Sequence, residues 1–221
     1  IANRDINLSA APGTIHAIVG ENGSGKSTLM KTLYGMHRPD EGTISINGTI
    51  ESFRSPTDAI AAGVGMVHQH FMLADNLSAL ENIILGAEPT RRGVIDYAGA
   101  RRRLGELQKA YGIDLDLDAI VESLGVGERQ RVEILKALYR GARILILDEP
   151  TAVLVPQEVD ELFGNLKHLV AEGVTILFIS HKLDEVLAIS DEITVIRDGH
   201  TVATVLPADV DKRRLGELMV G

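Results

Sequence analysis

Gly20-Glu21-Asn22-Gly23-Ser24-Gly25-Lys26-Ser27 matches the pattern G-x-x-x-x-G-K-[ST], and the flanking sequence supplies the context that this pattern requires. The apolar run 14–19 predicts a short strand that starts at the Pro12-Gly13 turn, and residues 28–33 are good helix formers. A strand, a glycine-rich loop and a helix N-terminus together form a cradle for polyphosphate. The loop's backbone N–H groups can point inward because glycine has no Cβ. We therefore expect this chain to bind a nucleotide.

Two side chains of this loop have specific roles in the expected chemistry. Lys26 can reach the β- and γ-phosphates of a nucleotide, and the Ser27 hydroxyl can ligate Mg²⁺. A nucleotide with Mg²⁺ is therefore the expected ligand. The expected nucleotide-binding residues are Gly20, Glu21, Asn22, Gly23, Ser24, Gly25, Lys26, Ser27 and Thr28.

Composition narrows the classes of protein that remain. The chain has 221 residues, and its 45% apolar content can fill the core of one large α/β domain or of a domain with an inserted lobe. A net charge of −9, with 4% aromatic residues and no Trp, disfavours binding to nucleic acid. The absence of Cys excludes disulfides and thiolate metal sites. No run has the length of a membrane span and no signal peptide is present, so we expect a soluble chain, and its first residue, Ile1, suggests part of a longer protein.

The order of predicted elements indicates a core that is interrupted by helices. Asn47-Gly48 predicts a hairpin, and strand–helix alternation stops near residue 76 and resumes after residue 141. Between them the period is helical with almost no strand signal, a capping box opens at Ser78, and the arginines 101–103 are expected to form a solvated helix face. The predicted fold class is α/β. It is a P-loop NTPase core (1–75 and 141–221) with a mixed sheet, antiparallel near the N-terminus, and an inserted α-helical subdomain (76–140).

A second motif supplies the acidic partner that a phosphate-binding loop needs for its metal. The apolar run 144–147 ends in Asp148 and Glu149, and side chains alternate across a strand, so the two carboxylates are expected to face different ways. Asp148 can hold Mg²⁺, and Glu149 can polarise an attacking water as general base. An acidic pair at the end of a strand is weak evidence alone, but together with the glycine-rich loop it indicates nucleotide hydrolysis.

At this point the chain resembles the ATP-binding-cassette (ABC) ATPases over nearly its whole length. Gln69, after the strand predicted at 64–68, looks like the glutamine that contacts the metal and couples the site to the helical lobe. Ser180-His181-Lys182 looks like the switch that contacts the γ-phosphate. The resemblance implies that Glu149, His181 and Gln69 are catalytic and that Ser27, Gln69 and Asp148 hold the metal. The signature that contacts the partner's ATP would comprise Leu124, Gly125, Val126, Gly127 and Glu128.

Finer features resemble the first cassette of tandem ATPases that power bacterial import of simple sugars and nucleosides. These features are the segments 65–73, 132–140 and 151–154, and the ending at Gly221. The resemblance implies head-to-tail pairing with a second cassette, on the same chain or another copy, and docking on transmembrane permease subunits. An extracytoplasmic solute-binding protein would act indirectly, and no nucleic-acid partner is expected. The chain would then lie peripherally at the cytoplasmic face of the cell membrane.

Three positions depart from the family's usual pattern. Gly125 stands where serine is usual, which removes a hydroxyl donor to the partner's nucleotide and predicts an asymmetric pair of sites. Val155 replaces an aspartate that many cassettes use for communication across the dimer. The chain starts at Ile1 without the upstream aromatic residue that stacks on adenine, so weak ATP binding by this fragment is expected.

Two other functions stay open. A nucleic-acid or translation-linked ABC clamp would need a basic face or a long coiled-coil insert, against which the net charge of −9 and the short helical insert argue. A regulatory module that binds ATP without hydrolysis would not need Glu149 and His181, and both are present.

Overall fold

The central sheet has six strands in the order β10-β9-β1-β8-β7-β4, of which only β10 runs antiparallel to its neighbour. A computed structural model describes residues 3–221, so the expectation attached to Ile1 lies outside the described residues. Both faces of the inner strands are buried, which suits their near-continuous apolar sequences. The strands are β1 (Ile15–Val19), β4 (Val64–Val67), β7 (Ile144–Asp148), β8 (Thr175–Ile179), β9 (Glu192–Arg197) and β10 (His200–Val205).

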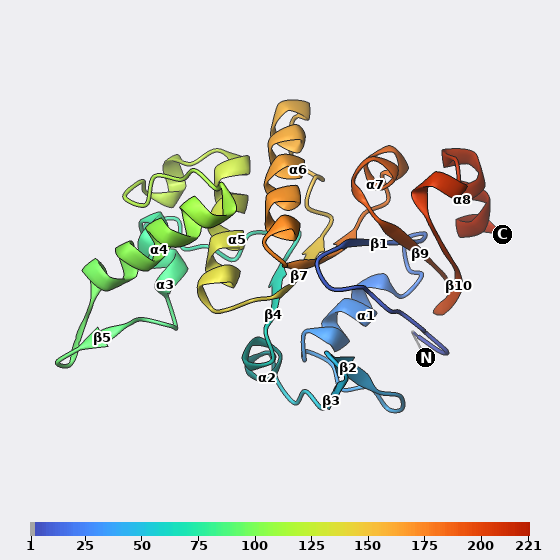
Figure 1. The fold of residues 1–221 in the computed structure, drawn as a ribbon, viewed down its shortest axis with the longest axis horizontal. Helices are drawn as coiled ribbons and strands as arrows, with labels where there is room; N and C mark the ends of the chain where they lie inside the picture. The colour runs from blue at the N-terminus through green and yellow to red at the C-terminus, as the bar shows by residue number, and fades with distance from the viewer. Residues whose placement is uncertain (1–2) are drawn as a thin grey trace.

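Helices cover both faces of this sheet (Figure 1). One face carries α1 (Lys26–Leu33), α2 (Pro56–Ala61) and the separate hairpin of β2 (Ile44–Ile46) and β3 (Thr49–Glu51). The other face carries α6 (Pro156–Ala171), α7 (Leu183–Ile189) and α8 (Lys212–Val220). The predicted α/β fold with a mixed sheet is confirmed. Its N-terminal antiparallel part is the hairpin β2–β3, whose turn at Asn47-Gly48 has two positive φ angles.

Three α-helices lie between β4 and β7 and form a group beside the sheet (Figure 1). They are α3 (Ala79–Ile84), α4 (Tyr97–Tyr111) and α5 (Val126–Tyr139), and α5 packs against both α3 and α4. The capping box predicted at Ser78 is present, because its hydroxyl accepts the Glu81 N–H and its own N–H donates to the Glu81 carboxylate. No helix in the part of the chain that the structure describes is long and apolar enough to span a bilayer.

One expectation for this helical segment is wrong. A short hairpin, β5 (Thr90–Arg91) with β6 (Val94–Ile95), projects from it, and strands of two residues are too short to show an alternating pattern. The arginines 101–103 are exposed, as expected for a solvated helix face, and two of them also make specific contacts. Arg101 pairs with Asp118, while Arg103 donates to the Tyr139 carbonyl and lies over the Tyr139 ring at 4.5 Å.

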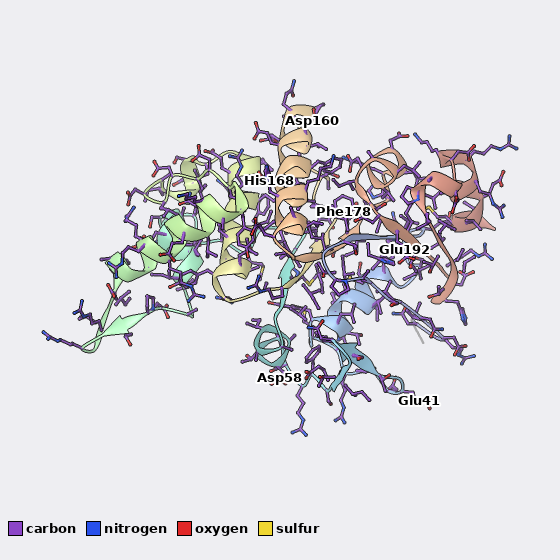
Figure 2. All side chains as sticks on the ribbon, in the orientation of Figure 1. Glu41, Asp58, Asp160, His168, Phe178 and Glu192 are labelled. Carbon is purple, nitrogen blue, oxygen red and sulfur yellow. The ribbon has the colours of Figure 1, made fainter. Side chains whose placement is uncertain are left out.

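The main core lies between the sheet, the helical segment and α6–α8. Phe178 on β8 is fully buried and makes an edge-to-face contact with Phe163 on α6, with ring centroids 6.1 Å apart. Figure 2 shows Phe178 beside α6 and Asp160 near the end of that helix that points away from the sheet. A smaller core under α1, α2 and the β2–β3 hairpin fills the opposite face.

Candidate nucleotide-binding site

The strand order brings four of the predicted motifs to one edge of the sheet. Strands β1, β8, β7 and β4 are parallel neighbours, so their carboxyl ends lie at the same edge, where ligands bind in open α/β sheets. The glycine-rich loop follows β1, and His181 follows β8. Asp148 ends β7, and Gln69 follows β4. Residues that are far apart in the sequence therefore share one edge.

The glycine-rich loop folds back over its own lysine. Gly23 and Gly25 have φ angles of 85° and 105°, a conformation that side-chain-bearing residues rarely adopt, and α1 begins directly after them. The ammonium of Lys26 donates to the carbonyls of Gly20 at 2.7 Å and Glu21 at 2.9 Å. Burial lowers the pKa of Lys26, and the charges of Glu149 and Asp148 oppose that shift. The loop thus holds a positive charge against two of its own backbone carbonyls.

The loop fits a phosphate group in two further respects. The hydroxyl oxygen of Ser24 is buried and has no hydrogen-bond partner within residues 3–221, which is expected where a bound group supplies one. The first N–H groups of α1 have no intrahelical acceptor and carry the positive end of the helix dipole. The donor set suits Mg²⁺ less directly, because Ser27 and Asp148 offer two oxygen ligands and the remainder would come from phosphate and water.

Glu149 and His181 meet beside this loop. The Nδ1 atom of His181 lies 2.9 Å from Oε1 and 2.8 Å from Oε2 of Glu149. Glu149 has a φ of 51°, which is rare for a residue with a side chain and is found where a site imposes strain. The Glu149 N–H donates to the Ile179 carbonyl, so β7 and β8 together fix this carboxylate next to the histidine.

Burial, assisted by the charge of Glu149, raises the pKa of Asp148. A raised carboxyl pKa means that the folded state binds its proton more tightly than the unfolded state, so this group costs stability at neutral pH and the cost disappears as pH falls through the folded-state pKa.

We therefore expect Asp148→Asn to raise the melting temperature of the nucleotide-free protein at pH 7. About 1 kcal/mol corresponds to roughly 2–4 °C for a chain of this size, and the difference from wild type should shrink in acid. Thermal unfolding at several pH values tests this. A variant that melts lower than wild type at pH 7 contradicts the expected sign.

Two of the predicted groups form no hydrogen bond with Lys26, Glu149 or His181. Gln69 is exposed and forms no hydrogen bond within residues 3–221. The predicted signature lies at the start of α5, where Gly125 is the N-cap, and therefore belongs to the helical segment. The N–H groups of its two glycines already have acceptors: Gly125 donates to Glu128 at 2.9 Å and Gly127 donates to Glu158 at 3.1 Å.

Two site-supporting residues escaped sequence reasoning. Glu158 accepts the N–H groups of both Gly127 and Val155, so it joins the start of α5 to the start of α6. Gln130 is buried and donates to the Pro150 carbonyl at 2.9 Å, which ties α5 to the turn after the two carboxylates. The capping box signal at Glu158 is hidden, because Val155 occupies the N-cap position where Ser or Thr would reveal it.

Comparison with known proteins gives consistent matches. A family model described as "ABC transporter" matches residues 3–152. The nucleoside import ATP-binding protein NupA of Lactococcus lactis subsp. cremoris is 50% identical over 221 residues, which are all of this chain and 44% of the relative. The ribose import ATP-binding protein RbsA 2 of Burkholderia ambifaria is 51% identical over 218 residues, or 98% of this chain and 43% of the relative.

Among solved structures, a dimeric ATP-binding cassette in a post-hydrolysis state with ADP and phosphate matches with a TM-score of 0.76 and 26% identity. That match covers 93% of this chain and 90% of the other. The chain thus spans less than half the length of the curated relatives that it matches, but nearly the whole of a solved cassette.

Proposed function

Because this chain belongs to the ABC transporter family of ATP-binding cassettes, we propose that it hydrolyses ATP to drive the import of a simple sugar or nucleoside. The observation that carries the proposal is the meeting of Lys26, Glu149 and His181 at one edge of the sheet. The solute class is supported by the relatives with about 50% sequence identity, which are named nucleoside and ribose import proteins. The acidic net charge of −9 disfavours the alternative of a nucleic-acid clamp.

The proposed reaction assigns one step to each group at this edge. Lys26 and the N–H groups of the loop neutralise the β- and γ-phosphates, and Ser27, Asp148 and Gln69 would hold Mg²⁺, which adds positive charge where negative charge develops. Glu149 accepts a proton from a water molecule while the oxygen of that water attacks the γ-phosphorus. The bond between that phosphorus and the bridging oxygen then breaks, and ADP leaves. His181, oriented by Glu149 at 2.9 Å, donates to the γ-phosphate.

The proposed assembly completes the site from a second cassette. In it, residues 1–75 and 141–221 form the ATPase core, and the subdomain 76–140 docks on permease subunits at the cytoplasmic face of the membrane. A solved relative that is dimeric supports pairing of cassettes. The signature of this chain, Leu124 to Glu128, would then serve the partner's nucleotide, and Lys26 and Glu149 would serve its own.

The experiment for the proposed function uses the complete protein, reconstituted with its permease in vesicles. We expect ATP hydrolysis and ATP-dependent uptake of labelled ribose or of a labelled nucleoside. Hydrolysis that responds to DNA, RNA or ribosomes, with no solute uptake, would support the clamp instead. ATP binding without any turnover would support a regulatory module.

The replacement of serine by Gly125 yields a prediction about the opposite site. Suppose that the opposite site hydrolyses ATP about a hundredfold more slowly than the site of Lys26 and Glu149. A restored hydrogen-bond donor that contributes about 1.4 kcal/mol would speed the opposite site about tenfold. The total ATPase rate would then rise by only about a tenth. A Cβ at position 125 would meet only Glu128 Oε2 at 3.5 Å, so serine fits without strain. We therefore expect Gly125→Ser to change the steady-state rate less than about twofold, with Gly164→Ser on α6 as control. A several-fold rise would refute the silent opposite site.

A further inference from the structure

Two side chains of α5 form hydrogen bonds with the C-terminal end of the loop that carries Gln69. Glu133 accepts the Met72 N–H at 2.8 Å through Oε1, and the Lys136 ammonium donates to the Met72 carbonyl at 3.4 Å. Both backbone polar groups of Met72 therefore depend on side chains one turn apart on the same helix. We call this pair of contacts the Met72 bracket.

Burying the Glu133 carboxylate costs folding free energy, which indicates that this residue does more than stabilise the helix interface. Its residue is only 6% exposed, and it makes no ion pair within residues 3–221. A buried carboxylate without a close counter-ion stabilises a helix interface less than an apolar side chain of similar size. Lys136 is half-buried beside it at a cavity of about 260 Å³, and burial lowers its pKa while Glu133 opposes the shift.

A second side chain, Asn82, forms hydrogen bonds with the same loop two residues further along, at Ala74. Asn82 on α3 is fully buried, accepts the Ala74 N–H at 2.8 Å and donates to the Ala74 carbonyl at 3.0 Å. On the other side, β4 pairs with β7 up to Val67. Residues 69–71 form no hydrogen bond with the rest of residues 3–221. Gln69 thus lies in a short stretch without such hydrogen bonds. The sheet precedes this stretch, and the residues after it are hydrogen-bonded to helices α3 and α5.

We propose that Glu133 is a positioning residue that makes Gln69 follow the movements of α5. The inference rests on the proposed function, because it concerns the role of Gln69 in hydrolysis. The same helix carries Gly125 at its N-cap, eight residues or about 12 Å from Glu133. One rigid helix therefore joins the signature to the Gln69 loop. A displacement of the signature when two cassettes close would reach Gln69 through the bracket.

The test measures ATP hydrolysis by the complete protein assembled with its membrane partner. Glu133→Leu removes the acceptor of the Met72 N–H, and a lost hydrogen bond to a charged group corresponds to about a tenfold change. We expect kcat to fall about five- to tenfold, with KM for Mg-ATP changing less than about twofold, because the phosphate loop is untouched. Glu133→Gln keeps an oxygen acceptor and should recover most of the rate. Glu106→Gln, an exposed charge change on α4, should leave the rate unchanged.

A double-mutant cycle with Gln69→Ala separates positioning from stability. If Glu133 acts through Gln69, then Glu133→Leu should lower kcat less than about 1.5-fold once Gln69 is already alanine. A full additional fall, or an unchanged kcat with only a lower melting temperature, overturns the proposal. If Glu133→Leu does not fold, Lys136→Met removes the other half of the bracket and runs through the same cycle. A wild-type protein without turnover would instead overturn the proposed function.

Discussion

Glu149→Gln is expected to lower the rate of ATP hydrolysis about 10²- to 10³-fold while ATP binding persists. The amide cannot accept a proton from the attacking water, and removal of a general base typically costs a factor of this size. ATP affinity should persist because Lys26 contacts the loop carbonyls of Gly20 and Glu21 and remains in place. Single-turnover hydrolysis, together with a direct binding measurement, checks both halves. The ATP-bound pair of cassettes should accumulate.

The matched control for this variant is Glu172→Gln. Glu172 is exposed at the C-terminal end of α6, so the same change of charge there should leave hydrolysis within about twofold of wild type. Undiminished turnover by Glu149→Gln would show that another group accepts the proton. His181, whose Nδ1 lies 2.9 Å from Oε1 of Glu149, would then be the group to replace next.

Gly20→Ala is expected to have the largest effect on folding. A Cβ at this position would lie 2.2 Å from the carbonyl oxygen of Ile196 and 2.5 Å from the hydroxyl of Ser24. The first of these atoms is backbone in a central strand and cannot move aside without displacing β9. Forced overpacking usually costs about 1–3 kcal/mol, and a backbone clash lies at or above the upper end. That corresponds to a fall in melting temperature of roughly 6–12 °C.

The control for Gly20→Ala is Gly105→Ala on α4. A Cβ at Gly105 would meet nothing within 4 Å, and alanine is the better helix former, so this variant should melt at the same temperature as wild type or higher. Nucleotide binding should be lost in Gly20→Ala because the phosphate loop begins at that residue. A variant that binds ATP normally and melts like wild type would show that the loop and β9 accommodate a methyl group at position 20 without strain.

Local chemistry made much of this molecule predictable. The glycine-rich loop, the hairpin at Asn47-Gly48 and the capping box at Ser78 depend on neighbours within a few positions, so their residue types suffice to indicate them. The β5–β6 hairpin was missed because two-residue strands carry no periodic signal. The contact of Arg103 was not predicted, because its partner, the Tyr139 carbonyl, lies 36 positions away on another helix.

The sequence by itself determined which chemical groups are present and on which kind of element each one lies, because motif identity and hydrophobic period are local properties. Only the tertiary structure decided which of these groups meet. The strand order puts β8 between β1 and β7, which places His181 beside Glu149, 32 positions earlier in the chain. The contact of Glu133 with Met72 spans 61 positions, and that of Glu158 with Gly127 spans 31. Such contacts arise from the packing of helices on a sheet, and no pattern of neighbouring residues encodes them.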